Sequence, residues 1–221
     1  MLRYPCLVLD HDDTVVQSTP TIHYPAFMAT LNELRPDVRW SLEEFMQYSF
    51  EPGFEALCSE LLGFTPEEMA RQEENWRAFS LTHEPPMFPG MAELIRRQRA
   101  RGGLVCAVSH SEADIIARDY VKNCGFAPDL IFGWEQGPGR RKPSPWPLQE
   151  IMRVYGLAPG QLLMVDDLKP GWQMARTCGV PFAFAGWGSP VAAIHTFMRA
   201  GANHYFTRVE QLEELLVGCE R

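Results

Sequence analysis

The sequence lacks any long apolar run. Across its 221 residues, no uninterrupted apolar stretch approaches the ~20 residues that a membrane-spanning helix requires. Residues 1–5 also lack the extended apolar region of a secretory signal peptide. We therefore expect a protein that is neither membrane-spanning nor partnered with a membrane.

Paired cysteines are also missing. The six cysteines are scattered along the chain, and no two of them form a Cys-x-x-Cys pair. This spacing is typical neither of a disulfide framework nor of a cysteine metal site, so we expect a protein of the reducing cytoplasm.

Positive charge is scarce, with 20 Lys and Arg residues against 28 Asp and Glu residues and a net charge of −8. No uninterrupted basic run is longer than Arg140-Arg141-Lys142, so we expect no nucleic-acid partner. To bind an anionic substrate, this acidic chain would need positive charge or N–H donors at the site itself, and a metal cation or helix N-termini are the usual sources. The 46% hydrophobic and 22% charged residues are close to globular averages, which excludes disordered and fibrous classes.

Four short apolar runs predict strands that are buried on both faces, as in a parallel sheet. These runs are residues 6–9, 104–108, 162–165 and 182–185. Helical patterns lie between and after them, at residues 91–101, 112–123, 147–155 and 171–178. The alternation of strand and helix predicts an α/β fold with a doubly wound parallel sheet.

Residues 18–86 have a different character, with one helical pattern after another and no convincing strand. Ser41 with Glu44, and Thr65 with Glu68, each have the spacing of a capping box at a helix start. We predict a helical cap domain over residues 18–86, inserted into an α/β core domain made of residues 1–17 and 87–221. The alternative is that these helices simply pack on the sheet.

Polar residues follow three of the four apolar runs. Residues 10–14 (Asp-His-Asp-Asp-Thr) follow the first, Ser109 and His110 the second, and Asp166 and Asp167 the third. In open α/β sheets, ligands bind beyond the carboxyl ends of the strands. Carboxylates gathered there repel one another unless a cation lies between them, and oxygen ligands of this kind suit Mg²⁺. One such cluster alone would be compatible with helix capping, but the three together predict a metal site.

At this point the chain resembles the haloacid dehalogenase superfamily. Four motifs in chain order carry the resemblance: Asp10-x-Asp12-x-Thr14, Ser109, Lys142-Pro143-x-Pro145, and Asp166-Asp167-x-x-x-Gly171. The long gap between the first two is where members with a helical C1-type cap carry it. Pro89-Gly90 and Gly186-Trp187-Gly188 are similar to the phosphoglycolate phosphatase and β-phosphoglucomutase branch. The resemblance extends over essentially the whole chain.

The resemblance implies a Rossmann-like core and a Mg²⁺-dependent phosphatase that acts on a small-molecule phosphate monoester. Asp10 would attack phosphorus and form an aspartyl-phosphate. Asp12 would protonate the leaving alkoxide and later deprotonate the attacking water. The Asp10 carboxylate, the Asp12 backbone carbonyl and Asp167 would bind Mg²⁺, and Asp166 would bind it directly or through water.

The same resemblance implies which residues bind the substrate. Ser109 and the backbone amide of His110 would hydrogen-bond the phosphoryl oxygens, next to Thr14, and Lys142 would neutralise their charge and orient the nucleophile. The turn at residues 49–53 interrupts the helical stretch and would reach toward the pocket. Glu51 in that turn would disfavour a second anionic group on the substrate, unless it is only an exposed acid.

Some residues depart from the family's usual pattern. His11 and Asp13 stand where an apolar residue and Gly are common, Gln17 where Asp is frequent, and His110 where Asn is common. Asp13 leaves the local turn geometry open, although Asp, like Gly, tolerates a left-handed backbone.

Other functions remain as alternatives. A sugar-phosphate mutase resembles this chain closely, but its first motif usually ends in Val where Thr14 stands. A dehalogenase usually lacks an acid/base Asp at the position of Asp12, and a phosphonatase would need a cap Lys, which residues 18–86 do not contain. The non-enzyme alternatives are a phospho-accepting receiver-like domain, whose motif order differs, and a degenerate binding domain. We expect a monomer or a weak homodimer.

Overall fold

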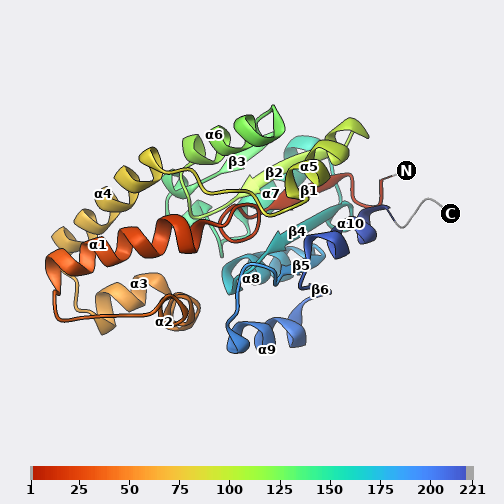
Figure 1. Ribbon diagram of the computed structural model, residues 1–221. Coiled ribbons are helices and arrows are strands. Elements are labelled where there is room, and N and C mark those ends of the chain that lie inside the picture. Colours follow the sequence, from red (N-terminus) through yellow and green to blue (C-terminus); the bar gives the residue numbers. More distant parts are fainter. Residues whose placement is uncertain (1, 218–221) are drawn as a thin grey trace.

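The computed structural model describes residues 2–217, and its centre is a six-stranded sheet in which all described strand pairs are parallel (Figure 1). The strands are β1 (Cys6–Leu9), β2 (Leu104–Val108), β3 (Leu130–Phe132), β4 (Leu162–Asp166), β5 (Phe182–Ala185) and β6 (His204–Phe206). Their order across the sheet is β3-β2-β1-β4-β5-β6, which places β1 near the centre. The predicted α/β fold class with a parallel sheet is confirmed.

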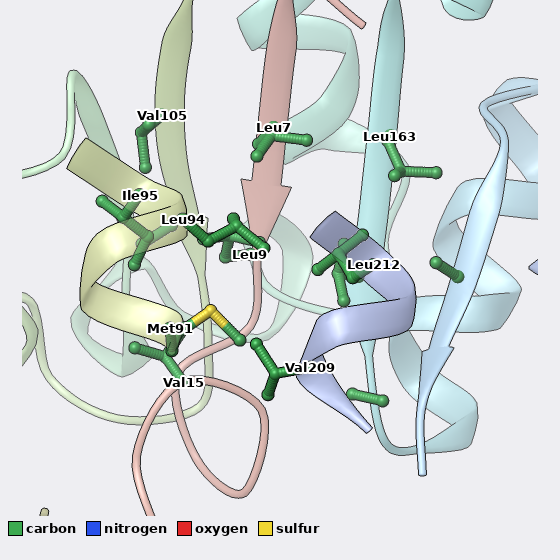
Figure 2. Close-up of a cluster of buried hydrophobic side chains, with 14 of the residues drawn as sticks. Leu7, Leu9, Val15, Met91, Leu94, Ile95, Val105, Leu163, Val209 and Leu212 are labelled. Carbon is green, nitrogen blue, oxygen red and sulfur yellow. The ribbon is translucent and has the colours of Figure 1, made fainter. Parts of the chain in front are cut away.

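Helices cover both faces of the sheet. One face carries α5 (Met91–Ala100), α6 (Ala113–Cys124) and α10 (Val209–Val217), and the other carries α7 (Trp146–Tyr155), α8 (Lys169–Cys178) and α9 (Ala192–Gly201). Successive strand residues point to opposite faces, so Leu7 and Leu9 enter the first core and Cys6 and Val8 the second. Figure 2 shows Leu9 between Leu94 of α5 and Leu212 of α10, with Leu7 farther back along β1.

Two strands were not predicted from the sequence. β3 and β6 have three residues each and lie at the two edges of the sheet. A run of three residues is too short to show a periodic pattern, so only pairing with a neighbouring strand identifies them. Short 3₁₀ turns at Trp134–Gln136, Pro138–Arg140 and Pro159–Gln161 connect the core elements. None of the described helices is long and apolar enough to cross a membrane.

The segment between β1 and α5 is helical, as predicted. It contains α1 (Tyr24–Leu34), α2 (Leu42–Tyr48), α3 (Phe54–Ala56) and α4 (Pro66–Thr82), with π-helical turns at Thr19–His23, Ser49–Gly53 and Leu57–Leu61. Both predicted capping boxes are present, at the N-termini of α2 and α4. We call residues Thr19 to Thr82 the insert, and Figure 1 shows it beside one end of the sheet.

The insert has an apolar core of its own. Phe27, Phe45 and Phe64 pack with Leu31 and Leu57 in a cluster separate from the two cores of the sheet. The insert also contacts the sheet domain, because two of its residues, Met46 and Phe50, belong to the core under α7, α8 and α9. The division of the chain into a core domain and a cap domain stays a prediction.

Candidate active site

The strand register brings the predicted motifs to one edge of the sheet. Leu9, the last residue of β1, pairs with Ala107 of β2 on one side and with Val165 of β4 on the other. Asp10 follows directly, and its N–H donates a hydrogen bond of 2.9 Å to the carbonyl of Val165. The residues that follow the three neighbouring strands therefore converge, because parallel strands end at the same edge.

Three carboxylates meet at this edge. Asp10, Asp166 and Asp167 are buried, and one ligand oxygen of each lies within 4.8 Å of the others. Burial and the neighbouring carboxylates raise the pKa of Asp166 to about 7 and the pKa of Asp167 well above its ordinary value. This group is the only set of three potential metal-ligating side chains at such spacing among residues 2–217.

Lys142 joins two of these carboxylates. Its Nζ donates hydrogen bonds of 2.7 Å to Asp10 Oδ1 and 2.6 Å to Asp166 Oδ2. Burial favours the neutral amine, but the two carboxylates outweigh it and raise the pKa of Lys142, so the side chain is an ammonium. One ammonium balances only one of the three carboxylates. A hard divalent cation with oxygen ligands would balance the other two, so the donor set fits Mg²⁺.

Gly171 is required by the close approach of α8 to this cluster. A Cβ at this position would lie 2.1 Å from Asp166 Oδ2, an oxygen that Lys142 holds in place. Asp166 Oδ1 also accepts a hydrogen bond of 2.8 Å from the N–H of Leu168. Because both oxygens are fixed, the carboxylate has no room to move away from a larger side chain.

Asp12 lies in a separate hydrogen-bonded position. Its Oδ2 accepts from the hydroxyls of Ser111 at 2.6 Å and Ser109 at 3.2 Å, and its Oδ1 pairs with His23 Nε2 at 2.9 Å. Burial favours the neutral acid, but His23, followed by His11 and Ser111, holds the pKa of Asp12 below its ordinary value. Here the hydroxyl of Ser109, predicted to hold phosphoryl oxygens, donates to Asp12.

His23 is a site residue that sequence reasoning missed. It comes from the insert, immediately before α1, and Trp76 of α4 donates a 2.8 Å hydrogen bond from Nε1 to His23 Nδ1. The two rings also stack, with centroids 6.2 Å apart. An indole N–H can only donate, so Nδ1 is unprotonated and Nε2 carries the hydrogen that faces Asp12. The six histidines show no ligand spacing in the sequence, and no local signal separates His23 from the rest.

The turn after β1 keeps its shape although Asp replaces the usual Gly. Asp13 has φ of 52°, which is the left-handed region that Asp tolerates better than most residues. Its Oδ1 accepts a 3.1 Å hydrogen bond from the N–H of Thr19, the first residue of the insert, and burial raises its pKa to about 6. Thr14 Oγ1 donates to Asp10 Oδ2 at 3.4 Å, which places the predicted site residue Thr14 beside Asp10.

His110 lies against the loop that carries Lys142. Its Nε2 donates a 2.9 Å hydrogen bond to the backbone carbonyl of Lys142, and its ring packs edge-on against Trp134. Burial, together with the charge of Lys142, lowers the pKa of His110 to about 4, so the ring is neutral at pH 7. In this arrangement the His110 side chain supports the Lys142 loop.

Glu51 lies apart from the carboxylate cluster. Its carboxylate forms an ion pair with Lys169, at the start of α8, and 68% of its side chain is exposed. A second ion pair, of 3.0 Å, joins Glu55 of α3 to Arg141, the residue before Lys142. Both pairs link the insert to the sheet domain, one at the start of α8 and one in the loop that carries Lys142. No hydrogen bond within residues 2–217 joins Glu51 to the cluster itself.

Comparisons with known proteins agree with this geometry. A family model described as haloacid dehalogenase-like hydrolase matches residues 4–179. A phosphoglycolate phosphatase of Thiobacillus denitrificans is 26% identical over 201 residues, which cover 85% of each chain.

Solved structures show the same fold. A Bacteroides fragilis protein described as a haloacid dehalogenase-like hydrolase has a TM-score of 0.78 at 18% identity, over 95% of this chain and 99% of its own. CbbY from Rhodobacter sphaeroides, solved in complex with phosphate, has a TM-score of 0.73 at 19% identity, over 96% of each chain.

Proposed function

The chain belongs to the haloacid dehalogenase-like hydrolases, and from that premise we propose that it is a Mg²⁺-dependent phosphatase. Its substrate is a small-molecule phosphate monoester, and the reaction passes through an aspartyl-phosphate on Asp10. The protein acts in the cytoplasm as a monomer or a weak homodimer. The phosphoglycolate phosphatase that matches 85% of the chain supports this reaction class.

The observation that carries the proposal is the pairing of Asp10 with Lys142 inside the carboxylate cluster. The buried ammonium holds Asp10 Oδ1 at 2.7 Å, so one carboxylate of the cluster is fixed in orientation at the end of the central strand. A fixed carboxylate beside a buried cation is suited to attack an electrophile that carries negative charge. A phosphate ester is such an electrophile.

The metal would be held by Asp10, Asp166 and Asp167, together with the backbone carbonyl of Asp12. When bound, Mg²⁺ supplies positive charge that screens the phosphoryl oxygens from the carboxylates. Asp166 already accepts hydrogen bonds from Lys142 and Leu168. Asp10 likewise accepts from Lys142 and Thr14, so we assign ligation to Asp10 and Asp167 and, directly or through water, to Asp166.

The first chemical step belongs to Asp10. One of its carboxylate oxygens forms a bond to phosphorus, and the bond between phosphorus and the ester oxygen breaks. Lys142 stabilises the charge on the transferring group, together with the hydroxyl of Ser109 and the amide of His110. The leaving alkoxide takes its proton from Asp12. A phosphoryl group that enters beside Asp12 brings negative charge, which favours the protonated form of that carboxyl.

The second step returns the enzyme to its starting state. Asp12 removes a proton from a water molecule, and the water oxygen attacks phosphorus. The bond between phosphorus and Asp10 then breaks and releases inorganic phosphate. The pKa of Asp12, held low by His23, suits a group that must be ionised before it can accept this proton.

Substrate choice belongs to the insert, which we propose moves as a cap domain over residues 18–86. Its hinges are residues 16–20 and 85–89. Glu51 lies on the turn that faces the sheet domain, and its carboxylate disfavours a second anion on the substrate. Glu51→Gln should therefore raise kcat/KM for a phosphate ester that carries a carboxylate, relative to kcat/KM for an aryl phosphate. An unchanged ratio would remove Glu51 from the substrate pocket.

The test is a screen of phosphate monoesters with purified protein. Release of inorganic phosphate should require Mg²⁺, stop when a chelator is added and return when Mg²⁺ is restored. Ca²⁺ should inhibit, because its larger and more variable shell misplaces the nucleophile. Asp10→Asn serves as the matched inactive control. Full activity in excess chelator, or in Asp10→Asn, would refute the proposal.

A further inference from the structure

A buried polar pair lies directly behind the two reactive carboxylates. His11 stands between Asp10 and Asp12, and its Nε2 donates a 3.1 Å hydrogen bond to Asp119 Oδ2 of α6. The two side chains are only 1% and 2% exposed. Burial of an imidazole and a carboxylate carries a desolvation cost, and an apolar pair of similar volume is often at least as stable. Stability alone therefore does not account for this pair.

His11 is held in place through both its backbone and its side chain. Its backbone carbonyl accepts hydrogen bonds from the N–H groups of Val15 at 2.9 Å and Val16 at 3.0 Å, which close the turn after β1. Its ring is tied to α6 through Asp119. Asp10 and Asp12 are the residues on either side, so a rotation of the backbone at His11 displaces both carboxylates.

Hydrogen bonds from Arg118 connect the His11–Asp119 pair to the insert. Asp119 Oδ1 accepts a 2.8 Å hydrogen bond from Arg118 Nε, and Arg118 Nη1 donates at 2.6 Å to the carbonyl of Ser80. Ser80 lies in the last turn of α4, where carbonyls have no partner within the helix. Arg118 therefore joins the end of α4 to the same carboxylate that holds His11.

A second contact ties α4 to the start of α6. Arg77 of α4 forms ion pairs with Glu112 and, at 2.5 Å, with Asp114. The insert thus contacts α6 at its start, through Arg77, and at its middle, through Arg118, while Asp119 of the same helix holds the loop of Asp10 and Asp12. The path from the insert to the reactive loop is continuous and consists of hydrogen bonds with good geometry.

We propose that His11 and Asp119 are positioning residues that hold the Asp10–Asp12 loop in its reactive shape, and that Arg118 makes this shape depend on the seated position of the insert. The inference rests on the proposed function for its kinetic consequence. The loop geometry itself does not depend on which reaction the site performs.

The neighbouring Tyr120 provides a matched control. It is fully buried in the same helix and lies against the His11 ring, with centroids 6.0 Å apart. Its hydroxyl makes no hydrogen bond to any described residue. Tyr120→Phe therefore changes the surroundings of His11 and leaves the hydrogen-bond path intact.

The first experiment measures kcat and KM for an aryl phosphate in His11→Leu, Asp119→Asn and Tyr120→Phe. His11→Leu and Asp119→Asn should lower kcat by roughly 10- to 100-fold, because small misplacements of reacting groups have effects of that size. KM and the inhibition constant of inorganic phosphate should stay within about twofold, because the phosphate-binding groups are unchanged. His11→Gln, which keeps a donor near Asp119, should recover part of kcat. Tyr120→Phe should match the wild type.

The second experiment tests the link to the insert. Arg118→Lys keeps the charge and shortens the reach to Ser80, so kcat should fall as in His11→Leu. The double variant His11→Leu/Arg118→Lys should have a kcat no lower than that of His11→Leu alone, because the effects of substitutions along one hydrogen-bond path are not additive. If the fold reductions in kcat of the two single variants multiply in the double variant, the proposed link between the insert and His11 is wrong.

The third experiment does not depend on activity. Amide hydrogen exchange of residues 11–16 in the metal-free protein should be faster in His11→Leu and Asp119→Asn, and unchanged in Tyr120→Phe. This readout separates the positioning inference from the proposed reaction, because it holds even if no phosphate ester is hydrolysed. Unchanged exchange in both variants, with kcat within twofold of the wild type, would overturn the inference.

Discussion

At the scale of single residues, the site separates two aspartates by their hydrogen-bond partners. Asp10 is held by an ammonium and a hydroxyl, whereas Asp12 is held by two serine hydroxyls and an imidazole. Neither carboxylate is bound by the partners of the other. This separation supports different roles for two residues that are only two positions apart in the chain.

Two variants distinguish these roles. Asp12→Ala should still form the phosphoenzyme from an aryl phosphate, because a good leaving group needs little protonation. Water attack lacks its base and should slow by about 10²–10⁴-fold. Phosphate should then accumulate on Asp10, detected by intact mass after acid quench, and Asp10→Asn should show none. Phosphate on another residue, or undiminished turnover in either variant, would contradict the assignment.

His23 allows a second test at this scale. His23→Phe removes the donor to Asp12 Oδ1, and kcat should fall by about 10- to 100-fold, since positioned proton transfer contributes 10²–10⁴-fold in enzymes. Trp76→Phe keeps the ring and removes the N–H that fixes the His23 tautomer, so it should lower kcat by a smaller factor. Trp172→Phe, which removes a similar indole hydrogen bond from α8 to the carbonyl of Gly201 on α9, is the control and should leave kcat unchanged.

At the scale of elements, the site depends on how closely α8 approaches the end of β4. α8 begins at Lys169, two residues before the predicted start, because Pro170 fits the first turn of a helix. Its first turn then packs Gly171 directly against Asp166. The acidic end of β4 and the start of α8 therefore form one closely packed corner.

Gly171→Ala tests this corner. The added Cβ would overlap Asp166 Oδ2, so we expect a loss of about 1–3 kcal/mol in the free energy of unfolding from overpacking, together with weaker Mg²⁺ binding. Gly160→Ala, where an added Cβ meets nothing within 4 Å, should change stability by less than about 0.5 kcal/mol. Chemical denaturation and Mg²⁺ titration measure the two effects. Equal behaviour of the two variants would show that α8 can move away.

At the scale of the whole molecule, folding forces three carboxylates together with one ammonium. A carboxyl whose pKa is raised in the folded state holds a proton that the unfolded chain releases. Between the unfolded pKa near 4 and the folded pKa of Asp166 near 7, rising pH therefore lowers stability. We expect bound Mg²⁺ to offset this loss, because a divalent cation stabilises ionised carboxylates.

Thermal unfolding with and without Mg²⁺ checks this coupling. At a Mg²⁺ concentration 100 times the Kd, binding adds about 2.7 kcal/mol, which for a chain of this size raises Tm by roughly 5–10 °C. The rise should be larger at pH 8 than at pH 5. Asp167→Asn should be more stable than the wild type in metal-free buffer at pH 8, and its Tm should respond little to Mg²⁺. A variant less stable than the wild type there would show that the carboxylates do not repel.

The sequence alone determined the central strands and the residues that follow them. β1, β2 and β5 are continuous apolar runs, and β4 is one as far as Val165, because a strand buried on both faces needs such a run wherever it lies in the sheet. Acidic residues directly after β1 and at the end of β4 interrupt these runs abruptly, so Asp10, Asp166 and Asp167 stand out locally. The two capping boxes of the insert are equally local, because their partners are three residues apart.

Only the tertiary structure decided the partners of those residues. β3 and β6 are identified by pairing with β2 and β5, because three residues carry no period of their own. His23 meets Asp12, and His11 meets Asp119, because the insert and α6 pack beside the end of β1. No pattern in the chain marks these histidines, since hydrogen bonds between distant segments depend on how whole elements pack.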